Sequence, residues 1–89
     1  MLVAVTVKAR IPGLKESVFQ KATHMFDLKP SDSVFDLKKL LNRVFHSQGI
    51  DFYEKMERGE YLNPINLDTE CKRLPANEHK SRCIWAKLV

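Results

Sequence analysis

The chain has 89 residues, which is the size of one domain with a single modest core. Its apolar fraction of 44% and charged fraction of 29% are typical of an ordinary globular protein. No apolar run approaches the roughly 20 residues of a transmembrane helix. The two cysteines, Cys71 and Cys83, are too few for a disulfide scaffold. We therefore expect a single domain over residues 1–89, in the cytoplasm, with free thiols.

The net charge of +4 is unevenly placed along the chain. Up to Phe45 there are eight Lys and Arg residues against four Asp and Glu residues, whereas from His46 onward the numbers are seven and seven. Clustered positive charge attracts an acidic partner to one side of a protein. A basic face that is merely solvated is the alternative, because charge patterns inform on partners and not on fold.

The first two expected elements form a β-hairpin. Alternation predicts a strand from Val3 to Ile11, and the same alternation from Met1 without a basic leader argues against a signal peptide. Its inward side chains are Val3, Val5, Val7 and Ala9, and its outward ones are Thr6, Lys8 and Arg10. Pro12-Gly13 ends it, and a second strand runs to Leu28 with His24, Phe26 and Leu28 on one face.

A helix follows from Ser33 to about Ser47. Pro30 ends the second strand because it has no N–H to donate, and Ser33 with Asp36 resembles a capping box. The Ser33 hydroxyl is expected to accept a hydrogen bond from the first turn, worth about 1 kcal/mol. The apolar residues at helical spacing are Val34, Leu37, Leu41, Val44 and Phe45.

The remaining sequence predicts three more strands. Ile50 to Met56 is the third, Arg58-Gly59-Glu60 a turn, and Tyr61-Leu62 a short fourth strand. Asn63 to Lys80 is expected to be mostly loop, with one helical turn near Asp68, and the last strand runs from Arg82 to Val89. We predict an α+β fold in which the last strand lies parallel to the first, in the centre of a mixed sheet of four to five strands, with one helix packed across it.

This order resembles the ubiquitin-like β-grasp family. Pro30-Ser31-Asp32-Ser33-Val34 is similar to its Pro-Ser-Asp-Thr-Ile, Gly49-Ile50 to its Gly-Ile, and Met56-x-x-Gly59-x-x-Leu62 to its Ile-x-x-Gly-x-x-Leu. The departure is Lys55, where the family has a core leucine, so the register of the third strand is open.

A closer likeness is to the N-terminal ubiquitin-like lobes of talin-type FERM heads and of Shank proteins, and to Ras-association domains. Ile11-Pro12-Gly13-Leu14 is similar to the Shank-type Ile-Pro-x-Leu, and Pro30 to Asp36 is similar to the talin-type Pro-Ser-x-x-Val-Tyr-Asp. Such lobes bind GTP-loaded Ras- and Rap-type proteins. The resemblance implies that this chain would use the basic residues of its hairpin and helix, namely Lys8, Arg10, Lys15, Lys21 and Lys39.

Two alternatives remain open. The ubiquitin family binds partners through an apolar patch on its open sheet face, and here that patch would comprise Met56 and Trp85, since tryptophan is enriched at binding hot spots. Packing of Trp85 against the Asn63–Lys80 loop is the competing interpretation of that residue. The second alternative is that the chain is a purely structural lobe that packs on neighbouring domains of a longer scaffold. Convergence of the basic set would favour GTPase binding, and scatter would favour the structural lobe.

The sequence argues against catalysis, cofactors and metals. It has no phosphate-binding glycine loop and no nucleophile motif. Cys71, His79 and Cys83 match no zinc spacing, and His24 is expected to be a half-buried packing residue. Nucleic acid is disfavoured because acidic residues are mixed with the basic ones and no aromatic pair interleaves them. We expect a monomeric protein-interaction domain of a scaffold or cytoskeletal adaptor, not an enzyme.

Overall fold

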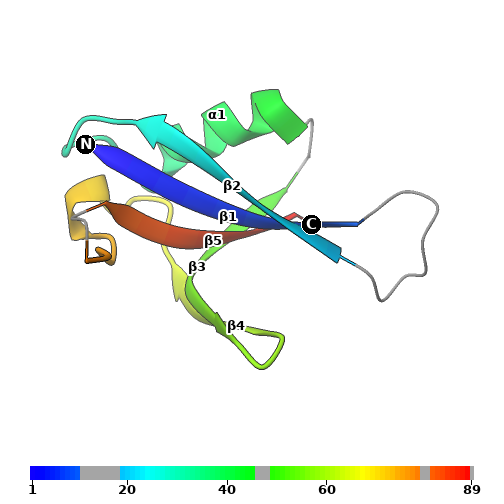
Figure 1. The fold of residues 1–89 in the computed structure, drawn as a ribbon. Helices are drawn as coiled ribbons and strands as arrows, with labels where there is room; N and C mark the ends of the chain where they lie inside the picture. The colour runs from blue at the N-terminus through cyan, green and yellow to red at the C-terminus, as the bar shows by residue number, and fades with distance from the viewer. Residues whose placement is uncertain (11–18, 46–48, 79–80, 89) are drawn as a thin grey trace.

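The computed structural model describes residues 1–10, 19–45, 49–78 and 81–88, with the side chains of residues 9, 10, 19 and 20 excepted. Five strands form one mixed sheet in the order β2-β1-β5-β3-β4. One helix, α1 (Val34–Phe45), packs across a single face of it, which gives the α+β, β-grasp-like fold that the sequence predicts (Figure 1). The strands are β1 (Leu2–Arg10), β2 (Phe19–Asp27), β3 (Ile50–Glu57), β4 (Glu60–Ile65) and β5 (Arg82–Leu88).

The centre of the sheet has the predicted topology. β1 and β2 pair antiparallel over all nine residues, from Leu2 opposite Asp27 to Arg10 opposite Phe19. β5 pairs parallel with β1, with Val5 opposite Ile84, and antiparallel with β3. Because side chains alternate between the faces of a strand, this register carries the inward valines of β1 onto the same face as Ile84. The predicted parallel central pair is therefore confirmed.

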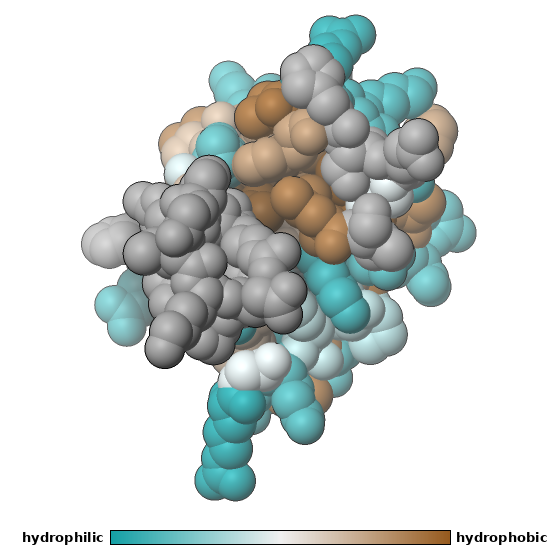
Figure 2. Space-filling view, turned by 90° about the vertical axis from the view of Figure 1, so that its right-hand side faces the viewer, coloured by the Kyte–Doolittle hydropathy of each residue, from teal (hydrophilic) through white to brown (hydrophobic). Residues whose placement is uncertain are grey.

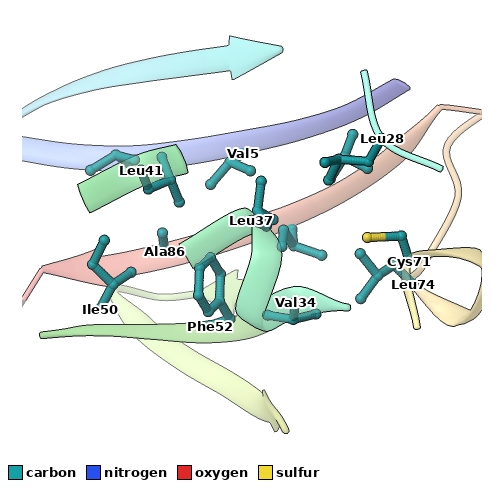
Figure 3. Packing of buried hydrophobic residues seen from close by; sticks show 13 residues of the cluster. Val5, Leu28, Val34, Leu37, Leu41, Ile50, Phe52, Cys71, Leu74 and Ala86 are labelled. Atoms are coloured by element: carbon teal, nitrogen blue, oxygen red, sulfur yellow. The ribbon is translucent and has the colours of Figure 1, made fainter. Parts of the chain in front are cut away.

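The core fills the space between α1 and the sheet. Val34, Leu37 and Leu41 are completely buried, and Figure 3 shows them directed toward side chains of β3 and β5, including Phe52 and Ala86. The helix thus presents the face that its apolar spacing predicts. The other buried core members are Val3, Val5, Val7, Leu28, Ile50, Phe52, Cys71, Leu74, Ile84 and Ala86.

The start of α1 is capped differently from the expectation. Ser33 is the N-cap residue, since its carbonyl accepts the Asp36 and Leu37 N–H groups at 3.0 and 3.3 Å. However, its hydroxyl donates to Asp36 Oδ2 at 3.3 Å, and the same oxygen accepts the Ser33 N–H at 3.0 Å. The Val34 and Phe35 N–H groups are instead bound by backbone carbonyls beyond β4, at Thr69 and Leu67. The start of α1 is therefore capped by the Asp36 carboxylate, which accepts the Ser33 N–H, and by the backbone carbonyls of Leu67 and Thr69.

This arrangement makes Asp36 more important to stability than Ser33. Asp36→Ala should lower the free energy of unfolding by about 1 kcal/mol, because it removes the acceptor of a half-buried N–H and a negative charge at the helix start. Ser33→Ala should cost less, since its hydroxyl caps no backbone N–H. Urea denaturation of both variants measures the difference, with Asp36→Asn as a control that keeps an acceptor oxygen without the charge. A larger loss in Ser33→Ala would contradict this order.

The segment after Gly59 differs most from the sequence expectation. β4 extends to Ile65, beyond the predicted Tyr61-Leu62, and Pro64 is accommodated because β4 is an edge strand. The expected helical turn near Asp68 lies instead at Cys71–Arg73, as a 3₁₀ helix. Cys71 and Leu74 are buried, at 0% and 2% exposure. Residues 63–65 thus belong to β4 and not to the predicted loop, whereas residues 66–78 are mostly loop with one helical turn, as predicted, and Lys80 lies outside the described residues.

The register of β3 is defined by Phe52. Phe52 and Ile50 are buried at 2% exposure under α1, whereas Lys55 is exposed and pairs with Glu57 at 3.3 Å. Lys55 stands opposite Leu62 in the β3–β4 pair, so it does not replace a core residue. The turn between the two strands uses Arg58 and Gly59, both at positive φ, as a two-residue β-hairpin requires.

Polar and apolar residues are unequally distributed over the end of the molecule at which α1 stops. Figure 2 shows apolar residues gathered in the upper part of this end, with hydrophilic residues below them. Val44, in the last turn of α1, is 48% exposed.

Among the described residues, no helix is long and apolar enough to span a membrane.

Candidate functional site

Among the described strands, β2 forms the longer of the two outer edges of the sheet. β2 is the first strand in the sheet order, and its pairing partner among the described strands is β1. The opposite edge is β4, which has six residues and contains Pro64. An edge strand presents backbone N–H and C=O groups that can pair with a strand of another chain. β2 is therefore the edge that is best suited to strand addition.

Two of the five predicted basic residues lie together beside this edge. Lys8 stands directly opposite Lys21 in the β1–β2 pair. Because Val7 is buried under α1, the neighbouring Lys8 points to the other face of the sheet, which we call the open face. Lys21 is exposed on that face, with its Nζ 5.4 Å from the centre of the Trp85 ring. The Arg10 side chain and all of Lys15 lie outside the described residues.

Lys39 is separated from these lysines by the whole sheet. It lies on α1, which covers the face opposite the open face, and its Nζ is 4.7 Å from the centre of the Phe35 ring. The preceding Lys38 lines an open hollow of about 320 Å³ against β3 and β4, on the side of the helix away from β2. The structure therefore brings Lys8 and Lys21 together and does not bring Lys39 to them.

The alternative apolar pair is likewise not brought together. Trp85 is half-buried on the open face, opposite Tyr53 in the β3–β5 pair and opposite Thr6 in the β1–β5 pair. Met56 is three residues farther along β3 than Tyr53, about 10 Å at the usual rise of a strand, and it faces Tyr61 of β4. Trp85 thus has Thr6, Tyr53 and Lys21 as neighbours, and not Met56.

Tyr53, Tyr61 and Lys87 are the residues on this face that the sequence interpretation overlooked. The two tyrosine rings are 5.1 Å apart, and Lys87 Nζ lies 5.8 Å from the centre of the Tyr61 ring. Partial burial raises the pKa of Tyr61, with a smaller contribution from Tyr53, so the phenol stays neutral at physiological pH. In the folded chain, an aromatic pair thus lies beside Lys87, and a single ring, that of Trp85, lies beside Lys21.

The remaining candidate residues have packing roles. The His24 ring makes an edge-to-face contact with Phe45 at 5.1 Å and is half-buried, as predicted. Burial raises the pKa of the Cys71 thiol, and the carboxylates of Asp32 and Asp36 raise it further. Within the described ranges, no three His, Cys, Asp or Glu residues are grouped in a way that could hold a metal ion. His46 and His79 lie outside those ranges.

Neither protein families nor curated proteins offer a relative with which to interpret this surface. A comparison with models of known protein families finds no match, and a comparison with curated proteins finds no similar protein. The site is therefore described by its own geometry: an open β2 edge, two paired lysines beside it, and an aromatic and basic sheet face.

Proposed function

We propose that this chain is a non-enzymatic protein-interaction domain that accepts a strand of its partner at the edge of β2. The observation that carries the proposal is the position of β2, nine residues long, at the outer edge of the sheet. Backbone hydrogen bonds across such an edge supply affinity with little dependence on sequence. The side chains next to the edge must then supply specificity.

The charge beside the edge favours an acidic partner. Lys8 and Lys21 lie opposite each other on neighbouring strands, so two positive charges stand beside this edge. Positive charge beside the edge would attract an acidic group of a partner and accelerate association. A Ras- or Rap-type GTPase in its GTP form is the partner class that the resemblance to talin-type and Shank-type lobes suggests.

Charge reversal at one position tests this proposal. Lys21→Glu should weaken binding of a GTP-loaded Ras or Rap protein, mainly by slowing association, and the effect should shrink as salt screens the charges. Stopped-flow association rates at several salt concentrations provide the measurement. Lys39→Glu is the matched control, because it makes the same change of charge on the opposite side of the molecule.

Two outcomes would count against the proposal. One is that no GTP-loaded Ras or Rap protein binds the wild-type chain at about 100 μM, a weak affinity of about −5.5 kcal/mol. The other is that Lys39→Glu slows association as much as Lys21→Glu, because the charge would then act without direction. Both variants should remain folded, since exposed charges contribute little to stability.

A further inference from the structure

An aromatic strip crosses the open face of the sheet. It consists of Trp85 from β5, Tyr53 from β3 and Tyr61 from β4. Trp85 and Tyr53 are directly opposite each other, and the Tyr53 and Tyr61 rings lie 5.1 Å apart with an angle of 41° between their planes. All three residues are half-buried, so each keeps part of its surface accessible. Three neighbouring strands thus present adjoining aromatic side chains on the side that α1 does not cover.

Lysines flank this strip at both ends. Lys21 Nζ is 5.4 Å from the centre of the Trp85 ring, and Lys87 Nζ is 5.8 Å from the centre of the Tyr61 ring. Lys21 and Lys87 are both exposed, and Lys8 stands opposite Lys21. Asp51 stands opposite Lys87, whereas the residue opposite Lys21 is another lysine, Lys8. Three adjoining aromatic rings therefore lie between two ammonium groups.

From this arrangement of rings and ammonium groups we infer that the open face binds single-stranded nucleic acid. Bases would stack on the rings of the aromatic strip, and the phosphates at its two ends would meet Lys21 and Lys87. Every base has a π-face, so such stacking requires no particular sequence, and a basic surface with aromatic rings is the usual platform for single strands. The bases of a duplex are already stacked on each other, so a single strand is the form that can use these rings.

The composition of the face favours a polyanion over a second protein. Lysine is depleted in protein–protein interfaces, whose cores contain few charges, whereas lysines that neutralise phosphates gain free energy from released counterions. The present cation–π contacts are no obstacle. Such contacts are weak at exposed positions, so an arriving base can displace an ammonium group from its ring toward the adjacent phosphate.

The single tryptophan provides a direct readout. Trp85 is the one tryptophan of the chain, so its fluorescence reports on the strip alone. The probes are 12-nucleotide oligo-uridylate and oligo-thymidylate, which separate RNA from DNA, and a duplex of the same length. We expect saturable quenching by one or both single strands. The logarithm of the binding constant should fall with the logarithm of salt concentration with a slope of about −1.4, because about two phosphates are neutralised at roughly −0.7 each.

Variants then locate the contact, with binding followed by the anisotropy of labelled oligonucleotides. Trp85→Ala should weaken binding roughly fivefold to hundredfold, which is the usual effect of losing one stacked base. Lys87→Ala should weaken binding and reduce the salt slope by about 0.7. Lys39→Ala is the matched control on the other side of the sheet and should leave both quantities unchanged. Because Trp85 is half-buried, Tyr61→Ala and the surface variant Lys87→Ala keep the test valid if Trp85→Ala does not fold.

Several results would overturn the inference. Absence of single-strand binding at about 100 μM chain in low salt would do so. So would tighter binding of the duplex than of both single strands, or an equal loss in Lys39→Ala, because either points to unspecific charge attraction. Equal affinity for a poly-glutamate peptide would assign the face to an acidic protein instead. Failure of this test would leave the strand-addition proposal standing, since that proposal rests on the β2 edge.

Discussion

Leu37→Ala should lower the free energy of unfolding by about 2–5 kcal/mol, the usual range for a buried leucine. Leu37 is completely buried, and it lies between Val34 and Leu41 on the face of α1 that meets the sheet (Figure 3). Removing its isobutyl group leaves a cavity in the core between α1 and the sheet. Among the described residues α1 is the one α-helix, so only small shifts of the surrounding side chains can reduce this cavity. Guanidinium denaturation followed by far-ultraviolet circular dichroism measures the loss.

The control for this variant lies on the same helix. Val44→Ala removes a side chain that is 48% exposed, so it should change the free energy of unfolding by no more than about 0.5 kcal/mol. Alanine also has a higher helix propensity than valine, which offsets part of any lost contact. If the two variants lost the same stability, α1 would be rotated relative to the sheet, and the described core would be wrong.

The parts of the fold that follow from local patterns could be predicted from the sequence. The alternation of Val3, Val5 and Val7 repeats every second residue, and the spacing of Val34, Leu37 and Leu41 follows the helical turn. Each pattern depends on residues that are close in sequence, and burial of one face is enough to explain it. The hairpin, the helix and the central position of β5 are accordingly confirmed.

The candidate site was harder to predict because it depends on register between distant strands. The alternation of neighbouring residues shows that a side chain points away from the core. The side of the molecule on which that side chain then lies depends on how all the strands and the helix are arranged. Lys21 and Lys39 both lie outside the core, yet one joins Trp85 and the other lies on the helix across the sheet. Similarly, the approach of Tyr61 to Tyr53 and Lys87 requires β3 to lie between β4 and β5.

The contribution of the segment from Asn66 to Leu74 to stability was also hard to predict from the sequence. Its sequence is rich in polar and charged residues and indicates a surface loop. In the structure, the carbonyls of Leu67 and Thr69 bind the first turn of α1, and the Cys71 N–H donates to the Asp32 carbonyl at 2.7 Å. Two isolated apolar side chains, Cys71 and Leu74, complete the end of the core beside Leu28 (Figure 3). Leu67, Cys71 and Leu74 stand at i, i+4 and i+7, but three apolar residues in a short polar segment are too few to distinguish a buried segment from a surface loop.

Leu74→Ala distinguishes these two views of the segment. If the segment were a surface loop, the variant would lower the free energy of unfolding by no more than about 0.5 kcal/mol. Because Leu74 is only 2% exposed, we expect a loss of about 2–5 kcal/mol instead. Lys72→Ala is the matched control, because Lys72 is exposed two residues away and its ion pair with Glu70, at 3.4 Å, is a surface one. Guanidinium denaturation of the two variants compares the losses.

Alkylation of Cys71 shows whether the segment opens locally. In a Cys83→Ser background, the remaining thiol of the chain is Cys71, which is completely buried. Burial and the nearby Asp32 and Asp36 raise its pKa, so little thiolate forms at neutral pH in the folded state. We expect slow alkylation. Leu74→Ala should accelerate it at guanidinium concentrations well below the midpoint of unfolding, because the loss of one core contact frees the segment before the sheet unfolds.

A small loss of stability together with an unchanged alkylation rate would show that residues 66–74 are a surface loop after all. Acceleration confined to concentrations at which the whole chain unfolds would instead mean that the segment and the sheet form one cooperative unit.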